Sequence, residues 1–357
     1  MQKRSFGDED GDGGTGKRAK LETSSTSSTL VATSQTSTAL TTVQSDGRCS
    51  SLMAPEVTLH GHEGSVFSIA FDPSGQQLCS GGLDKKILLW DVLDECKNYN
   101  TLTGHRNAIL QVLWPTPTGI ISCSADKTVA CWDANKGTRV RKLVEHTAIV
   151  NAVAVARDMP HFIASGSDDC TVILWDNRQK QSVGSMYHDY QVLSVAMSAD
   201  GQTIYSAGID NVIRRFDVRN FEQPDLTLEG HGDSITGLSL SPDEKHLLSN
   251  AMDGTLRSWD VRPFAEGHSR CECVTGGVHH GAEKLLLRCG WSPDQAMVSA
   301  GSADRLVHTW DAHTFQAMPC WPGHKASVNE VIFHPTQRIL ASCSSDRTII
   351  LGELPAP

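Results

Sequence analysis

GHRNAILQVLWPTPTGIISCSADKTVACWD, residues 104–133, holds the pattern that decides the fold of this chain. A Gly-His pair opens it, an alternating apolar run and a turn follow, and a second short run leads to Asp126. Six residues after that Asp comes Trp132, followed at once by Asp133. Alternation with a period of two predicts β-strands, and Pro and Gly between the runs predict turns.

The same pattern occurs seven times. The Asp/aromatic pairs are Asp84/Trp90, Asp126/Trp132, Asp169/Trp175, Asp210/Phe216, Asp253/Trp259, Asp304/Trp310 and Asp346/Gly352, the last without a ring. Successive Asp residues are 42, 43, 41, 43, 51 and 42 positions apart. A period of about 40–45 residues from Gly-His to Trp-Asp resembles the WD-repeat family, in which each repeat is a four-stranded propeller blade. We therefore predict an all-β, seven-bladed WD-repeat β-propeller over residues 53–357, preceded by a tail over residues 1–52.

Each copy also places a His and a Ser before its Asp. The histidines, 21 to 23 residues before it, are His62, His105, His146, His188, His231 and His324. The serines, four residues before it, are Ser80, Ser122, Ser165, Ser206, Ser249 and Ser342. The family resemblance implies that each set forms a hydrogen-bonded tetrad with the aromatic residue. One such set would suggest a hydrolase, but a set in every repeat is typical of a structural role.

The sixth copy departs from this pattern. Ala300 replaces the serine, and the histidine is expected to be His279 or His280, at a longer spacing of 24 or 25 residues. The repeat pattern therefore does not define a tetrad in this copy.

The two ends of the repeat region indicate how the ring closes. The seventh copy stops one strand short of a full blade, while residues 55–59 (PEVTL) precede the first Gly-His pair with nothing to pair with. We expect this segment to become the outer strand of the last blade, which removes an open sheet edge.

Residues 1–52 have the composition of a disordered tail, rich in Gly, Asp, Ser and Thr, with one aromatic residue. Two basic clusters lie in it, Lys3-Arg4 and, twelve residues later, Lys17-Arg18-Ala19-Lys20. Their spacing is that of a bipartite nuclear import signal, and it predicts a nuclear protein. The alternative is a solvated charge run balanced by the acidic residues of the tail.

Charge and cysteine usage limit the functions of the body. Six Lys/Arg and six Asp/Glu cancel in residues 1–52, so the formal charge of −10 belongs to residues 53–357. An acidic body argues against broad nucleic-acid binding, so RNA contact is expected to be indirect or minor. The eleven cysteines include no CxxC pair. Cys271 and Cys273 lie near His279 and His280, but ordinary thiols are favoured there over a zinc site.

Neither a membrane span nor a secretory leader is apparent, so we expect an intracellular protein. P-loop, GxSxG and HExxH motifs are also missing from the sequence, and no catalytic activity, metal or cofactor is predicted.

Five short stretches resemble, beyond the generic repeat, the WD-repeat subunits of the U-five small nuclear ribonucleoprotein. These are residues 249–253 (SNAMD), 259–264 (WDVRPF), 284–289 (KLLLRC), 300–305 (AGSADR) and 351–354 (LGEL). The resemblance implies a spliceosomal component that acts in pre-mRNA splicing without chemistry of its own. It also implies a monomeric propeller docked on the particle's large scaffold protein, Prp-eight.

Two WDxR motifs offer a different function. Residues 175–178 (WDNR) and 259–262 (WDVR) fit the pattern of propellers that are substrate receptors of cullin-type ubiquitin ligases. The alternative is that Arg178 and Arg262 only cap the turn that follows each third strand.

A partner surface is predicted from the residues beside each repeated Asp, since these turns emerge on one face. Basic residues stand there in four neighbouring blades: Lys85 and Lys86, Lys127, Arg305 and Arg347. Apolar residues precede the Asp in three blades: Leu83, Ile209 and Met252. A basic arc on an acidic body would steer an acidic segment or a phosphate toward this face. Ordinary solvated turn residues are the alternative.

Overall fold

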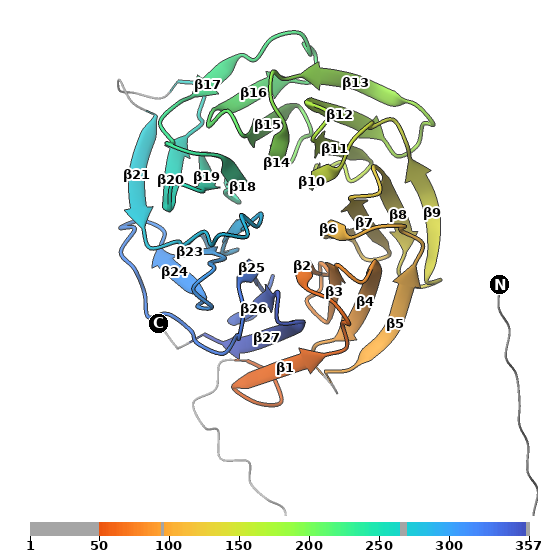
Figure 1. Cartoon of the computed structure of the whole chain (residues 1–357), viewed down its shortest axis with the longest axis vertical. Coiled ribbons are helices and arrows are strands. Elements are labelled where there is room, and N and C mark those ends of the chain that lie inside the picture. Colours follow the sequence, from red (N-terminus) through yellow and green to blue (C-terminus); the bar gives the residue numbers. More distant parts are fainter. Residues whose placement is uncertain (1–49, 94–95, 265–269, 355–357) are drawn as a thin grey trace, which may run out of the picture. The chain divides into compact units, whose positions relative to one another are not determined.

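The structure is a computed structural model that describes residues 50–93, 96–264 and 270–354. Within these residues the chain forms 27 strands in seven sheets, arranged as blades around a common centre (Figure 1). The predicted seven-bladed propeller is confirmed. Most of the predicted tail, including both basic clusters, lies outside the described residues. None of the described residues belongs to a helix long and apolar enough to cross a membrane.

The strands follow one another blade by blade. Blade one has β2 (Val66–Phe71), β3 (Gln77–Gly82), β4 (Lys86–Asp91) and β5 (Asn98–Thr103). Blade two has β6 (Ile109–Thr116), β7 (Gly119–Ser124), β8 (Val129–Asp133) and β9 (Thr138–Leu143). Blade three has β10 (Val150–Val155), β11 (Phe162–Ser167), β12 (Thr171–Asp176) and β13 (Ser182–Tyr187). Blade four has β14 (Val192–Met197), β15 (Thr203–Gly208), β16 (Ile213–Asp217) and β17 (Leu226–Leu228).

The remaining blades complete the ring. Blade five has β18 (Ile235–Leu240), β19 (His246–Ala251), β20 (Thr255–Asp260) and β21 (Cys271–Gly276). Blade six has β22 (Cys289–Trp291), β23 (Met297–Ala300) and β24 (His308–Asp311). Blade seven has β25 (Val328–Phe333), β26 (Ile339–Ser344), β27 (Thr348–Glu353) and β1 (Glu56–His60).

Each blade is an antiparallel sheet whose first strand lies innermost. Its two faces bury apolar side chains against the neighbouring blades, so the core is a series of clusters between blades. The marker aromatics Trp90, Trp175, Trp259, Trp310 and Phe216 are among the largest side chains that are fully buried. Burial of this kind contributes roughly 1.5–3 kcal/mol for each large apolar side chain.

The ring closes as the two ends of the sequence predict. β1 pairs antiparallel with β27, from Glu56 opposite Gly352 to His60 opposite Thr348 (Figure 1). Leu59 on β1 is only 2% exposed and joins the cluster between blades seven and one. The body begins slightly before residue 53, because Leu52 is buried in the same cluster and Ser51 Oγ donates to Gln337 Oε1 at 2.8 Å.

Blade six is the irregular one. Its sheet has three strands, and isolated bridges, Val307 to Trp321 and Trp310 to Ala317, stand where a fourth would be. The longer spacing of 51 residues before its Asp is divided between the segment from β20 to β21 and the connection from β21 to β22, both of which are longer than their counterparts in blades one to four.

A β-bulge recurs at the same position of the innermost strand in every blade except the sixth. A side chain in this position accepts a hydrogen bond from a backbone N–H of the next blade at four places around the ring. The pairs are Ser68 with Val112, Gln111 with Val153, Ser194 with Leu238, and Glu330 with Ile69, at 2.8 to 3.0 Å. These bonds satisfy amides that would otherwise be buried without a partner, and they join consecutive blades.

Candidate interaction surfaces

The predicted tetrads are complete in blades one, two, three and five. In blade one, His62 Nδ1 lies 2.8 Å from Asp84 Oδ2 and His62 Nε2 lies 2.7 Å from Ser80 Oγ. Trp90 Nε1 donates to the same hydroxyl at 2.8 Å. The equivalent sets are His105, Ser122, Asp126, Trp132; His146, Ser165, Asp169, Trp175; and His231, Ser249, Asp253, Trp259.

Each tetrad links the loop before the first strand to the turn after the second, which defines one face of the ring, here called the tetrad face. The serine hydroxyls of the four complete sets are 0% exposed and already bound by both an imidazole and an indole. A nucleophile needs access to its substrate, so this arrangement favours the structural role predicted for the tetrads.

Hydrogen bonding determines the charge state of the tetrad carboxylates. Burial alone would raise the pKa of Asp253, but hydrogen bonds from Thr255, Gly232 N and His231 outweigh it and lower that pKa to about 2. Burial lowers the pKa of His231, against the opposing effect of Asp253. At neutral pH, Asp253 is therefore anionic beside a neutral His231.

Asp253→Ala is expected to lower the free energy of unfolding by about 1–3 kcal/mol, because His231 and two backbone amides lose their acceptor. The pKa of Asp253 is depressed on folding, so its contribution is present above pH 4 and is lost as pH falls toward 2. Urea titrations at pH 7 and at pH 3 should therefore show a smaller deficit at the lower pH. Asp189→Ala, at an exposed position, is the control, and an equal effect of both variants would contradict a buried role for Asp253.

Three blades depart from the full tetrad. Blade seven keeps His324, Ser342 and Asp346 but lacks the indole, as the sequence indicates. In blade four His188 reaches Ser206 at 3.2 Å, while Asp210 pairs with Arg214.

The prediction that His279 or His280 is the tetrad histidine of blade six is wrong. Asp304 Oδ2 pairs with His308 Nε2 at 2.7 Å, a residue four positions after the Asp instead of upstream of it. His279 donates only its backbone N–H to Ser302 Oγ, and both ring nitrogens of His280 are buried without a partner among the described residues. Trp310 Nε1 is likewise left without an acceptor in the described chain, because Ala300 offers no hydroxyl.

The predicted basic arc lies on the tetrad face. Lys85, Lys127, Arg305 and Arg347 are exposed. The innermost strands of blades six, seven, one and two adjoin in that order, so these residues stand on consecutive blades. Lys86 is partly covered, and its Nζ pairs with Glu63 at 3.1 Å.

Backbone geometry also constrains these positions. In all seven blades the residue after the tetrad Asp has a positive φ, between 62° and 76°. Gly254 occupies this position in blade five and Asn211 in blade four, and both residue types tolerate the left-handed conformation. Lys or Arg there adopts a less favourable conformation, which a Gly would avoid.

The predicted apolar residues are exposed to different degrees. Leu83 is 51% and Ile209 43% exposed, whereas Met252 is half-buried.

The WDxR arginines are engaged within their own turns. Arg178 Nε and Nη2 bind Asp176 at 2.9 and 2.8 Å, and Arg262 Nε binds Asp260 at 2.9 Å. The hydrogen bonds from Arg178 lower the pKa of Asp176 to about 2. This geometry favours the alternative in which the arginines cap the turns.

Thiols of the Cys271 and Cys273 pair stay protonated, because burial raises the pKa of each. The described residues include no group of three or more His, Cys, Asp or Glu placed to hold a metal ion.

A buried charge pair was missed by the sequence analysis. Arg288 and Glu330 are 5% and 8% exposed, and Arg288 Nε lies 3.9 Å from Glu330 Oε1. Arg288 extends from blade six across the centre of the ring, where Nη2 donates to Asn151 O at 2.9 Å and to Leu110 O at 3.3 Å. A single side chain thus connects blade six to blades two and three.

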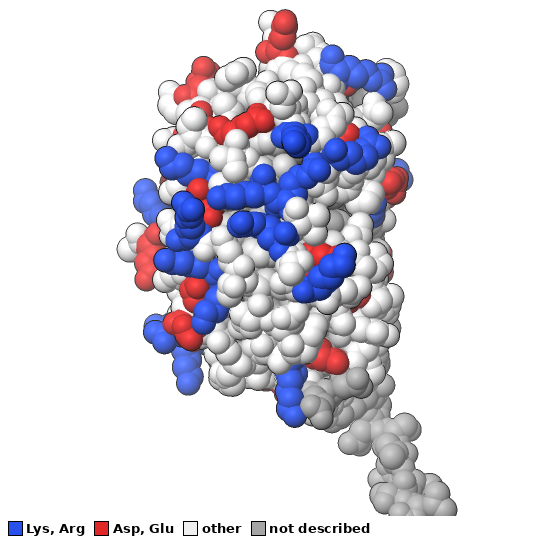
Figure 2. Space-filling model, turned by 90° about the vertical axis from the view of Figure 1, so that its right-hand side faces the viewer, with Lys and Arg blue, Asp and Glu red and all other residues white. Residues whose placement is uncertain are grey.

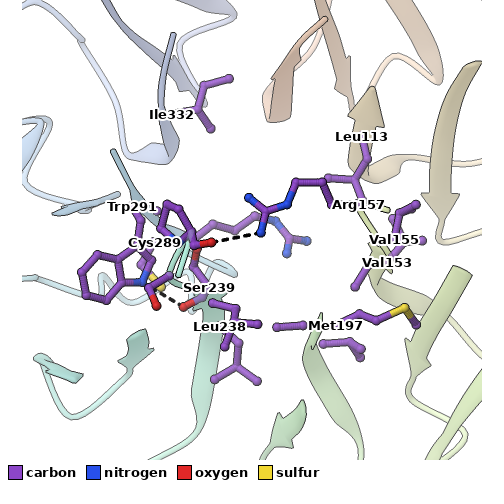
Figure 3. A pocket seen from close by; sticks show the side chains of 18 of the residues that line it. Leu113, Val153, Val155, Arg157, Met197, Leu238, Ser239, Cys289, Trp291 and Ile332 are labelled. Carbon is purple, nitrogen blue, oxygen red and sulfur yellow. Dashed lines mark hydrogen bonds between the residues drawn. The ribbon is translucent and has the colours of Figure 1, made fainter. Parts of the chain in front are cut away.

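These two charges are among the residues that line a central cavity of about 390 Å³. Apolar side chains of several blades line it, among them Leu113, Met197 and Leu238 (Figure 3). Arg157 extends into it, with Nη2 3.1 Å from Pro242 O. The lining includes Arg157, Ala199 and Pro242, which follow innermost strands on the face opposite the tetrads. The cavity is therefore separate from the basic arc.

Comparisons with known proteins agree with this architecture. The family described as WD domain, G-beta repeat matches residues 53–91, 96–133, 137–176, 180–217, 222–260, 266–311 and 315–351. A U5 small nuclear ribonucleoprotein 40 kDa protein of Dictyostelium discoideum is 46% identical over 86% of this chain and 86% of its own length. The protein of the same name in Homo sapiens is 47% identical over the same shares, and pre-mRNA-splicing factor cwf17 of Schizosaccharomyces pombe is 44% identical over 86% of this chain and 90% of its own.

These relatives confirm the resemblance to U-five WD-repeat subunits that the five short stretches indicate. The chain belongs to the WD40 repeat family and, within it, to the family of the U5 small nuclear ribonucleoprotein 40 kDa proteins.

Proposed function

We propose that this protein is a non-catalytic scaffold of the spliceosome, a subunit of the U5 small nuclear ribonucleoprotein that holds other splicing proteins together. The observation that carries the proposal is a sequence identity of 44–47% over 86–90% of the length of relatives that are named for that particle and for splicing. The buried tetrad hydroxyls support a role in binding without catalysis.

Affinity purification of the full chain from nuclei tests this function. Core splicing proteins together with U-rich RNA are the expected co-purifying components. Recovery of a ubiquitin-ligase adaptor in their place would overturn the proposal.

The partner proposed for the tetrad face is the large scaffold protein Prp-eight. Support comes from the resemblance to U-five subunits and from the basic arc, whose four exposed cations stand on consecutive blades of an acidic body. Such a strip accelerates encounter with an acidic segment, an effect that salt screens.

Lys85→Glu, Arg305→Glu and Arg347→Glu together are expected to reduce incorporation into the U5 particle by about tenfold, because three attractions become repulsions. The loss should be largest at low salt, and the melting temperature should stay nearly unchanged. Incorporation can be measured by co-sedimentation with U5 particles in nuclear extract. Normal incorporation of the folded triple variant at low salt would contradict binding through the basic arc and indicate another surface.

Nuclear residence is the proposed localisation, supported by the spliceosomal relatives and by the two basic clusters of the tail. Replacing Lys17, Arg18 and Lys20 with Ala in a tail–reporter fusion is expected to reduce nuclear accumulation several-fold. Fluorescence microscopy gives the nuclear-to-cytoplasmic ratio, and an unchanged ratio would reassign the clusters as solvated charge.

A further inference from the structure

Charge is distributed unevenly around the propeller. Residues 104–143, which span blade two and the loop before it, contain six Lys and Arg against two Asp, a net +4. Residues 53–357 carry −10 in total, so the rest of the body carries −14. Both Asp residues are engaged, Asp126 by His105 and Asp133 by Lys136 at 3.0 Å. Blade two is therefore a cationic sector of an acidic ring.

The positive charge reaches the outer edge of this blade. β9 is its outermost strand and includes Arg139, Arg141 and Lys142. Figure 2 looks at the side of the ring on which Figure 1 places β9, and Lys and Arg gather there in a broad band with fewer acidic residues among them. The three cations of β9 lie at this outer edge, whereas Lys127 of the same blade belongs to the basic arc on the tetrad face.

Two of the guanidinium groups on β9 are held in place. Arg139 lies 6.0 Å from the centre of the Trp132 ring and donates to Gly104 O at 3.0 Å. Arg141 donates to Gln179 O in blade three. Side chains that are already ordered lose less entropy when they bind a partner.

A cavity of about 330 Å³ adjoins this strand, between blades two and three. Its lining includes Ile120, Trp132, Pro160 and Val140. Val140, on β9, is 67% exposed, and Val144, just beyond the strand, is 61% exposed. Three cationic side chains and two exposed valines thus lie along one edge, next to a partly apolar cavity.

We propose that this rim, meaning residues 139–144 and the cavity beside them, binds an acidic segment of a partner protein. The carboxylates of the segment pair with Arg139, Arg141 and Lys142, and one aliphatic or aromatic side chain enters the cavity beside Val140. β9 pairs on one side only in the described structure, so an extended peptide can also bond to its free backbone edge. This interaction is additional to the proposed scaffold role and does not depend on it.

Side-chain chemistry favours a protein over RNA here. Single-stranded RNA is bound by aromatic planes on which bases stack. The exposed apolar side chains of this rim are valines, and the indole of Trp132 is buried and covered by Arg139. Valines and a hollow suit an apolar anchor residue.

The test is fluorescence anisotropy with the full chain and a labelled peptide of about twelve residues, half of them Asp and Glu, with one central Leu. We expect salt-sensitive binding that weakens about tenfold, or about 1.4 kcal/mol, in Arg141→Glu/Lys142→Glu and in Val140→Asp. Replacing the Leu of the peptide with Ser should weaken binding comparably, since the cavity then stays empty.

Matched variants provide the controls. Val274→Asp changes a 54% exposed valine on the outer strand β21, and Lys284→Glu/Lys325→Glu reverses two exposed cations elsewhere. Both should leave binding unchanged, and thermal unfolding verifies that all variants are folded. Equal effects of rim and control variants, or no binding of the peptide, would overturn the site. Tighter binding of a labelled oligouridylate that the rim variants weaken would overturn the choice of a protein partner.

Discussion

A chain that begins at Gly61 is expected to aggregate, whereas one that begins at Ser50 stays monomeric and folded. The longer deletion removes β1, whose five residues pair with β27. It thereby removes two buried leucines, Leu59 on β1 and Leu52 before it. Two buried leucines contribute about 2–5 kcal/mol each, which approaches the whole stability of many proteins. The deletion also leaves β27 as a bare, apolar sheet edge, which invites pairing between molecules.

Size-exclusion chromatography with light scattering, followed by urea unfolding of the soluble fraction, measures both effects. The chain from Ser50 serves as the control, because it lacks only residues that the structure does not describe. If both truncations were monomeric with the same urea midpoint, the clasp would contribute nothing to the fold.

Arg288→Ala is expected to lower the free energy of unfolding by about 3–5 kcal/mol at pH 7 to 8, since it strands the buried Glu330 carboxylate. It also leaves the carbonyls of Leu110 and Asn151 without their shared donor. The double variant Arg288→Met/Glu330→Gln should lose less than Arg288→Ala alone, because it removes both charges while Gln can still accept from Ile69 N.

The pH dependence of that variant has a definite sign. Burial raises the pKa of Glu330 above its ordinary value, against the opposing effect of Arg288. The native state therefore binds this proton more tightly than the unfolded state does, and its stability rises as pH falls through this range. Without Arg288 that pKa rises further. The deficit of Arg288→Ala should therefore shrink as pH falls from 8 to 5 in urea titrations, and a deficit that grew would contradict a role for the charge of Glu330.

Sequence patterns determine most of the fold because each blade repeats the same local chemistry. The Asp-to-aromatic spacing, the upstream His and Ser, and the unpaired apolar strand before Gly61 predict seven blades and their closure. The outer part of blade six could not be predicted, because a segment with Pro319 and Pro322 forms isolated bridges there in place of a regular strand. His308 was missed since it approaches Asp304 from within the third strand of the blade.

The interaction surfaces could be predicted only in part from the sequence. Turn residues beside each Asp can be aligned by counting, which placed the basic arc on one face. Arg288 contacts carbonyls 178 and 137 positions away, so its role depends on ring geometry that a linear pattern does not contain. Summing charge over the whole body likewise concealed the cationic sector, because its +4 is outweighed by the remaining −14.

The pairing of β1 with β27 sets an order of events during translation. Thr348 follows His60 by 288 residues, and at roughly 5–20 residues per second the ribosome needs about 15–60 s to supply the partner of the first strand. Until then both ends of the ring are open, however many blades have already folded. A product that terminates before Thr348 therefore never closes, and it keeps an unpaired strand edge that can pair with another chain.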